Sequence, residues 1–317
     1  MRVIDSHVHF PSEKIIDDGE REVLSEASLS STLLLGRHQF KHEDHPWLSE
    51  EKQKWKQAWR FPDAEKLNSD DTFKRWQKEY QIRPYLKKLV FVTAGGNDFA
   101  AGLMRRDREH FIAYAHHDPL LPDAAERLEN ALGPLGLKGY KILGPLVDIS
   151  LNDKRFYPLW EIAQSREVPI LIHFGILGGA GGVANHVNIN PLIIHDVAKK
   201  FPALNIIIPH FGCGYVFETL NLCWACPNVF IDTSGSNQWM RWVPYELNLE
   251  ILFRKYRETI GASRIIFGSD SSWFPRGFTE IYLDEQIRSM IYVGYSENEL
   301  DAVFYRNAAS LLKLEEK

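Results

Sequence analysis

Residues 4–10 read Ile4-Asp5-Ser6-His7-Val8-His9-Phe10, an apolar run that ends in ligand-type side chains. The pattern is typical of a buried β-strand, in which successive side chains point to opposite faces. His7 and His9 are two positions apart, so both are expected on the same face. Two imidazoles held in this way form half of a metal site, and further ligands must come from elsewhere in the chain.

The composition is ordinary for a globular protein and excludes several classes of partner. A chain of 317 residues can form one large α/β barrel or two domains. The net charge of -5 gives no reason to expect nucleic acid or an anionic membrane as partner, because both attract basic surfaces. No apolar run approaches the roughly 20 residues that span a bilayer. The composition therefore gives no indication of a nucleic-acid or membrane partner.

The three cysteines lie close together at Cys213, Cys223 and Cys226. The last two form a C-x-x-C pair, which is a redox or zinc motif in some proteins. Here Leu222 and Trp224 make the surroundings apolar, which favours buried free thiols. An odd cysteine count and the lack of a signal peptide predict a reducing, cytoplasmic location.

Short apolar runs alternate with helical patterns along the chain. Eight such runs predict a closed (β/α)₈ barrel. A doubly wound nucleotide-binding fold is the alternative, but no G-x-G-x-x-G follows the first strand. The predicted strands are 2–10, 89–93, 111–115, 137–143, 168–172, 204–209, 229–232 and 264–267.

The segment between the first two predicted strands has a different composition, rich in Lys, Glu, Gln and Trp. Segments 48–60 and 71–81 have helical patterning. The segment is too small and too polar to bury a core of its own. We therefore predict a helical insertion over about residues 30–85, within a single domain that spans residues 1–317.

Ligand-type side chains fall at the carboxyl ends of the predicted strands, which meet on one face of a barrel. Any one of these residues alone would more often be a core or surface residue, but together they favour a metal site. They are His7 and His9 on the first strand, His173 on the fifth, His210 on the sixth and Asp270 on the eighth. His116 and His117 end the third strand, and alternation allows only one of them to face the barrel mouth.

These residues and their neighbours resemble the amidohydrolase superfamily, in particular the branch that includes aminocarboxymuconate-semialdehyde decarboxylase and related hydrolases and decarboxylases. The resemblance covers most of the chain except about residues 30–85. It is specific for fold and metal chemistry and says little about the substrate. The matching motifs are Asp-Ser-His7-Val-His9, Lys138-Gly-Tyr-Lys141, Ile-His173-Phe-Gly, Pro-His210-Phe-Gly-Cys-Gly, Gly-Ser-Asp270 and Asn307-Ala308-Ala309.

The resemblance implies one divalent metal ion, zinc in the first place and manganese as an alternative. Its ligands would be His7, His9, His173 and Asp270. His210 would act as general base or proton shuttle, and Asp270 would also orient the reacting water. This assignment agrees with the chemistry of zinc, which lowers the pKa of bound water to about 7.

Lys141 leaves the number of metal ions open. Some members of the superfamily carry a carbamylated lysine at the end of the fourth strand that bridges two metals, and Lys141 or Lys138 could take that place. The branch that the chain resembles usually holds one metal, so we expect one. Lys141 would then form an ion pair or contact an anionic substrate.

Substrate contacts are expected from segments that follow the strands. Residues 271–276 follow Asp270 directly and include Trp273 and Arg276. Arg276 could hold a carboxylate through two hydrogen bonds, and Arg241 after the seventh strand is a weaker candidate. These residues predict a small anionic substrate. The tryptophan-rich insertion could also bury against a second subunit, so a homo-oligomer is possible.

Two activities fit this ligand set. The first is a hydrolase that uses metal-activated water on an ester, lactone or amide of a small acidic molecule. The second is a non-oxidative decarboxylase, a carbon–carbon lyase, acting on an aromatic or muconate-type acid. His7 fits both types and does not separate them. A barrel that only binds ligands is a third interpretation, and the complete ligand set argues against it.

Overall fold

The computed structural model describes residues 1–11, 46–58, 61–178, 182, 184 and 187–314. Parallel strands alternate with helices along this part of the chain, as expected from the sequence. The strands are β1 (Val3–His9), β2 (Leu86–Thr93), β3 (Phe111–Ala113), β4 (Tyr140–Leu143), β5 (Ile170–His173), β6 (Ile206–Ile208), β7 (Val229–Asp232) and β8 (Ile265–Ile266).

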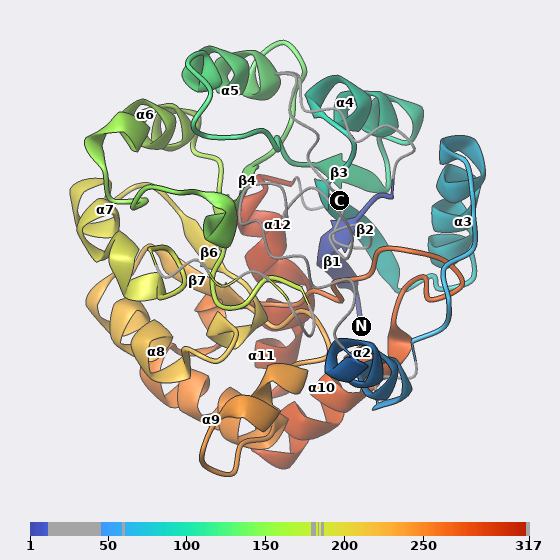
Figure 1. The fold of residues 1–317 in the computed structure, drawn as a ribbon. Coiled ribbons are helices and arrows are strands. Elements are labelled where there is room, and N and C mark those ends of the chain that lie inside the picture. The colour runs from blue at the N-terminus through green and yellow to red at the C-terminus, as the bar shows by residue number, and fades with distance from the viewer. Residues whose placement is uncertain (12–45, 59–60, 179–181, 183, 185–186, 315–317) are drawn as a thin grey trace.

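The strands run in sequence order around one ring (Figure 1). Regular pairing divides them into a sheet of β1-β2-β3 and a sheet of β4-β5-β6-β7-β8. Single parallel bridges join the two sheets at both seams, Ala115 to Tyr140 and Val8 to Ser271. Backbone hydrogen bonds of 2.8 Å reinforce each seam, from Ala115 N–H to the Gly139 carbonyl and from His9 N–H to the Ser271 carbonyl. The chain therefore has the predicted α/β barrel architecture.

Helices surround the ring and cover its outer face (Figure 1). The helix α4 was not expected from the sequence. The helices are α2 (Pro46–Ala58), α3 (Ser69–Gln81), α4 (Asn97–Arg106), α5 (Ala124–Leu132), α6 (Tyr157–Arg166), α7 (His195–Lys200), α8 (Val216–Ala225), α9 (Leu249–Ile260), α10 (Glu280–Tyr292), α11 (Glu297–Asp301) and α12 (Asn307–Leu311).

Two of these helices, α2 and α3, lie in the predicted insertion between β1 and β2. On α3, Phe73 and Trp76 are buried in the main hydrophobic core. This helix therefore packs on the barrel. Residues 12–45, which include the start of the predicted insertion, lie outside the described residues, and the insertion as a whole stays a prediction.

The core has two layers that follow the alternation of the strands. Alternate strand residues fill the interior of the ring, together with side chains of α12, while the residues between them pack against the surrounding helices. The interior cluster contains Ile4, Val90, Val92, Ile112, Tyr114, Leu171, Ile207, Ile266, Ala308, Ala309, Leu311 and Leu312. This apolar cluster fills the ring below the carboxyl ends of the strands. Polar side chains therefore lie at those carboxyl ends.

The strand β1 departs from regular alternation. Val3 and Val8 both belong to the outer cluster although they are five positions apart, whereas Ile4 faces the interior. The pairing of β1 with β2 shifts in register at three places, and between Asp5 and Val8 the extra residue lies on β1, because Asp5 pairs with Leu89 and Val8 with Phe91. Such an irregularity inserts an extra residue and reverses the alternation beyond it. His7, on the opposite side of the strand from Val8, consequently faces the barrel interior.

Gly139, at the start of β4, allows the close packing of the barrel interior. A Cβ atom there would lie 2.7 Å from Cε1 and Cζ of the buried Tyr114 ring. A Gly139→Ala variant should therefore lower the free energy of unfolding by about 1–3 kcal/mol through overpacking, as measured by urea denaturation. Gly102→Ala is the matched control on α4, where the nearest atom is 3.9 Å away and the helix should gain stability. Equal stability of the two variants would contradict this packing.

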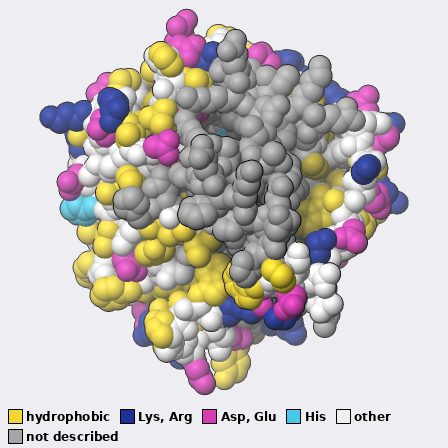
Figure 2. Space-filling view, viewed as in Figure 1, with side chains coloured by type: hydrophobic (Ala, Val, Ile, Leu, Met, Phe, Trp, Pro, Cys, Tyr) yellow, Lys and Arg dark blue, Asp and Glu magenta, His cyan; other side chains and the backbone are white. Residues whose placement is uncertain are grey.

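The surface carries several exposed apolar side chains. Figure 2 shows them over the lower left of this face, where α8 and α9 lie in Figure 1. On α8, Phe217 and Trp224 are 71% and 74% exposed. Association with a second copy of the chain stays a prediction.

None of the described helices is long and apolar enough to cross a membrane. The cysteines Cys213, Cys223 and Cys226 are free thiols in buried positions, as the sequence predicted.

Candidate active site

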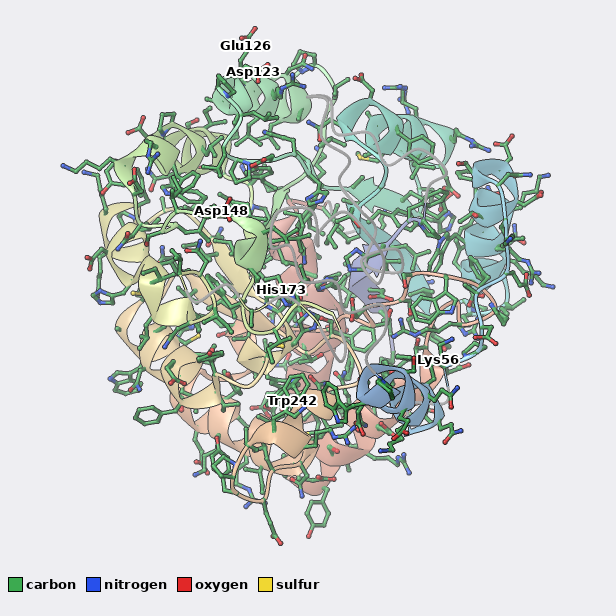
Figure 3. The ribbon with its side chains drawn as sticks, viewed as in Figure 1. Lys56, Asp123, Glu126, Asp148, His173 and Trp242 are labelled. Atoms are coloured by element: carbon green, nitrogen blue, oxygen red, sulfur yellow. The ribbon has the colours of Figure 1, made fainter. Side chains whose placement is uncertain are left out.

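A layer of polar side chains lies at the carboxyl ends of the strands, above the apolar interior. The predicted residues His7, His9, His173, His210 and Asp270 all belong to this layer. In Figure 3, His173 lies near the centre of the ring, whereas Asp123 and Glu126 of α5 lie at its outer edge. Contacts between the imidazoles connect the layer, with ring centroids 5.1 Å apart for His7 and His9 and 5.2 Å apart for His7 and His210.

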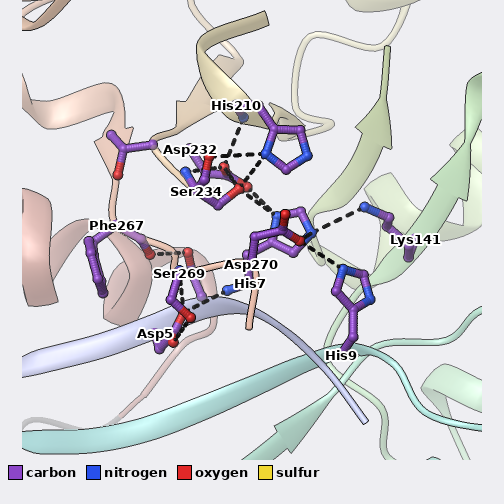
Figure 4. Close-up of polar contacts among 12 residues, drawn as sticks. Asp5, His7, His9, Lys141, His210, Asp232, Ser234, Phe267, Ser269 and Asp270 are labelled. Atoms are coloured by element: carbon purple, nitrogen blue, oxygen red, sulfur yellow. Dashed lines mark hydrogen bonds and ion pairs between the residues drawn. The ribbon is translucent and has the colours of Figure 1, made fainter. Parts of the chain in front are cut away.

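His7 is fully buried and is held by a carboxylate (Figure 4). Its Nδ1 lies 2.8 Å from Oδ2 of Asp232, which ends β7, and 3.0 Å from Oγ of Ser234. Nδ1–H donates a hydrogen bond to the carboxylate, so Nε2 is left as the ligand atom. Burial lowers the pKa of His7 to about 4, which keeps the ring in the neutral form that binds metals.

Asp232 stays ionised despite its burial. Burial alone would raise the pKa of this carboxyl group, but electrostatic interactions with His7 and His210 and hydrogen bonds from His7 and Ser234 hold it well below its ordinary value. Asp232 also accepts hydrogen bonds from the backbone N–H groups of His210, at 3.1 Å, and Ser234, at 2.9 Å. One carboxylate thus positions residues from β1 and from the segments after β6 and β7.

His9 contacts Asp270 directly. Its Nδ1 lies 2.6 Å from Oγ1 of Thr93 at the end of β2, and its Nε2 lies 3.2 Å from Oδ1 of Asp270. His9 is fully buried, whereas the Asp270 side chain is 22% exposed. Asp270 is therefore the member of this pair that opens toward the barrel mouth.

His210 is held in one orientation by Ser234. Its Nδ1 lies 3.1 Å from the Ser234 carbonyl oxygen and 2.9 Å from the Ser234 hydroxyl. A carbonyl oxygen can only accept, so Nδ1 carries the proton and Nε2 of the neutral ring has the lone pair. The His173 ring packs against His210 with centroids 5.1 Å apart, and its Nε2 lies 3.3 Å from the Ile176 carbonyl oxygen.

The backbone is strained at the two predicted catalytic residues. His210 and Asp270 have φ angles of 56° and 57°, in the left-handed region that non-glycine residues rarely adopt. Such strain persists only where the surrounding structure imposes it, and it is often found at functional sites. Gly235 leaves room for these side chains, because a Cβ there would lie 3.3 Å from both Asp270 Oδ2 and His210 Nδ1. Gly268 leaves room for His7, because a Cβ there would lie 2.7 Å from the His7 Cβ.

The donor set suits a divalent metal ion. Among the described residues, His7, His210 and Asp270 offer ligand atoms that lie within 4.8 Å of one another. This close group contains His210, which the sequence assigned to proton transfer, and lacks His9 and His173, whose Nε2 atoms contact Asp270 and Ile176. Buried neutral imidazoles, each with its second nitrogen hydrogen-bonded, together with a carboxylate are the usual ligands of zinc and related ions.

Of the two candidate lysines, only Lys141 reaches this layer. Lys138 is exposed, whereas Lys141 is fully buried on β4 with Nζ 3.4 Å from His7 Nε2. Lys141 therefore brings a cation next to the imidazole group, as Figure 4 shows.

The predicted substrate residues are divided between the mouth and the surface. Arg276 donates from Nη1 to the Asp270 carbonyl oxygen at 2.8 Å and lies over the Phe61 and Trp273 rings. Trp273 donates to the Pro62 carbonyl at 3.2 Å. Arg241 is exposed, and its charge acts on Lys54 of α2. The structure thus places Arg276 and Trp273 beside Asp270, and it does not bring Arg241 to the imidazole group.

Three residues of this network were not identified from the sequence: Thr93, Asp232 and Ser234. Asp232 had a visible signal, because it ends an apolar strand just as His173 does. Thr93 and Ser234 had none, since hydroxyl residues at strand ends are common and only their partners give them a role.

Comparisons with known proteins agree with this architecture. The family model described as "Amidohydrolase" matches residues 4–314. No significant match is found among curated proteins. Among solved structures, an uncharacterized TIM-barrel protein from Bordetella bronchiseptica is similar with a TM-score of 0.67 and 15% identity, and the match covers 99% of both chains.

Two further solved structures are similar over nearly their whole length. A dihydroxybenzoic acid decarboxylase from Polaromonas sp., with bound manganese and the inhibitor 2-nitroresorcinol, has a TM-score of 0.62 and 17% identity over 100% of this chain and 98% of that one. A probable 2-pyrone-4,6-dicarboxylic acid hydrolase from Acinetobacter baumannii, with citric acid bound, has a TM-score of 0.59 and 14% identity over 99% of this chain and 100% of that one. At such low identities the structural similarity shows the fold alone. The match of the family model to residues 4–314 shows that the chain belongs to the amidohydrolase family.

Proposed function

We propose that the protein is a metal-dependent hydrolase that adds water to an ester, lactone or amide bond of a small acidic molecule. The ligands would be His7, His9, His173 and Asp270. A divalent ion held there would lower the pKa of a coordinated water to about 7. Zinc suits a histidine-rich donor set, and manganese is the ion in the similar decarboxylase structure.

The orientation of His210 carries this proposal. Its Nδ1 donates to the Ser234 carbonyl, so Nε2 is the atom that accepts a proton from the attacking water and later returns it to the leaving group. The ligand atoms of His210, His7 and Asp270 lie within 4.8 Å of one another, so His210 is close enough to the proposed metal ligands to move this proton. Arg276 and Lys141 would hold the anionic part of the substrate, since Arg276 contacts Asp270 and Lys141 contacts His7.

Decarboxylation of an aromatic or muconate-type acid is the second candidate. The buried amine of Lys141, 3.4 Å from His7 Nε2, favours it, because a carboxylate held by that cation would lie against the imidazole group. The same fold supports a decarboxylase in the Polaromonas structure. On this interpretation His210 would supply the proton that replaces the lost carboxyl group.

Two substrate panels separate these candidates. The metal-loaded protein is incubated with lactones and esters of small acids and, in parallel, with aromatic and muconate-type acids. Hydrolysis should release one acid group per turnover in a pH-stat and incorporate ¹⁸O from labelled water. Release of CO₂ or bicarbonate without water addition would reject the hydrolase and support the decarboxylase.

The carboxylate behind His7 gives a further prediction. An Asp232→Asn variant should bind the metal about 10- to 100-fold more weakly, because an amide orients the imidazole without supplying negative charge. The dissociation constant is measured by competition with a chelator, and circular dichroism checks the fold. Asp123→Asn, on the exposed start of α5, is the matched control. An unchanged metal affinity in Asp232→Asn would remove this carboxylate from the metal site.

A further inference from the structure

His116 is a buried histidine at the barrel mouth to which the proposed chemistry gives no role. It follows β3, on which Ile112 and Tyr114 face the barrel interior, so the alternation places His116 on the same inner side. His117 points the other way, with Nε2 3.0 Å from the Ala124 carbonyl oxygen at the start of α5. The structure thus answers the question that the sequence left open, because His116 is the member of the pair that faces the mouth.

The hydrogen bonds of His116 determine which nitrogen carries the proton. Nδ1 lies 3.1 Å from the backbone carbonyl oxygen of Lys141, which can only accept. Nδ1 is therefore the donor, and Nε2 of the neutral ring carries a lone pair on the opposite edge. The backbone N–H of His116 donates to Oδ1 of Asn97 at 3.0 Å and fixes the segment. This side chain is held as a hydrogen-bond acceptor.

The acceptor Nε2 has no partner within the described part of the chain and is shielded from solvent. His116 is only 8% exposed, and polar atoms buried to this degree are nearly always paired in folded proteins. Its ring contacts the Lys141 backbone and interacts electrostatically with Lys141 and His9, so it lies next to the imidazole group. An unpaired acceptor at this place is available to a hydrogen-bond donor on a ligand.

We infer that Nε2 of His116 accepts a hydrogen bond from a hydroxyl or amino group of the substrate. The inference rests on the proposed function and narrows its substrate class. Lys141 and Arg276 supply cations for a carboxylate, and His116 adds a requirement for a donor on the β3 side of the mouth. The substrate is therefore a small acid that also carries a hydroxyl or N–H group. An analogue without the donor would leave Nε2 unpaired. Burial of an unpaired polar group costs free energy, so the site should bind such an analogue more weakly.

A binding experiment with matched probes tests the inference. The probes are the 2-, 3- and 4-hydroxybenzoates and their methyl ethers, titrated calorimetrically into metal-loaded protein. At least one hydroxy acid should bind about tenfold or more tightly than its ether. His116→Phe keeps a flat ring and removes the acceptor, so this ratio should fall to within about twofold. His116→Gln, which retains an acceptor oxygen, should keep part of the preference.

The controls separate this inference from the proposed function. His195→Gln, on the exposed surface of α7, should retain the full binding ratio, and circular dichroism and metal content show that each variant is folded and loaded. A full ratio in His116→Phe, or equal binding of every hydroxy acid and its ether in the wild type, would overturn the inference. Failure of the proposed hydrolysis has a different signature, namely normal binding ratios without hydrolytic product.

Discussion

A His7→Ala/His9→Ala double variant is expected to retain less than about one tenth of an equivalent of zinc or manganese and to lose all measurable turnover. The change removes two of the four proposed ligands, both of which lie next to Asp270. Metal is measured by mass spectrometry after loading and desalting. Retention of a full equivalent would count against the metal site itself.

The double variant also removes the partner of a buried carboxylate, so its fold must be checked independently. Asp232 would lose the His7 hydrogen bond, and breaking a buried pair typically costs about 3–5 kcal/mol. A single His9→Gln variant avoids this problem, because the Nδ1 partner of His9 is the neutral Thr93 hydroxyl. It should fold normally and still bind the metal more weakly. The matched control is His110→Gln, whose ring stacks on Tyr80 far from the mouth.

Replacement of His210 by Asn should lower kcat by about 10²- to 10⁴-fold while the metal stays bound, since a proton-transfer group is lost and the proposed ligands remain. Asn suits this position because it tolerates the left-handed backbone at φ 56° better than most residues. Steady-state kinetics and metal content are measured on the same preparation.

Two outcomes would contradict this role of His210. Unchanged turnover would remove His210 from the mechanism. Loss of the metal would assign His210 to the ligand set instead, in agreement with its place in the close group with His7 and Asp270. The Cys226→Ser variant changes a buried thiol at the end of α8. It is the control for effects of folding on kcat.

Much of the fold was predictable because each strand is a short apolar run that ends in polar residues. His173, His210 and Asp270 stand out for this reason, and their convergence follows from the barrel. The helix α4 was missed because Gly95-Gly96 precedes it and two glycines favour a loop. The residue Gly96 in fact precedes the first turn of that helix.

The partners of the site residues were harder to predict, since they depend on contacts between distant segments. Asp232 meets His7 across 225 positions in the chain, and only the closed ring brings them together. The inward orientation of His116 depends on the register of β3. The sequence alone does not define this register, so it does not show which of the two adjacent histidines faces inward. Arg241 was a weaker candidate than Arg276 in the sequence, and of the two only Arg276 is fixed to the Asp270 backbone.

The alternation of side chains along β1 makes the site sensitive to changes in chain length. His7 and His9 face inward because the alternation reverses between Ile4 and Val8. A substitution removes one imidazole at a time, whereas deletion of a single codon in this stretch would turn both toward the helices and bring Val8 to the barrel mouth. Descendants of this gene can therefore exchange either histidine stepwise, but an in-frame deletion or insertion here would remove both histidines from the proposed metal site in a single event.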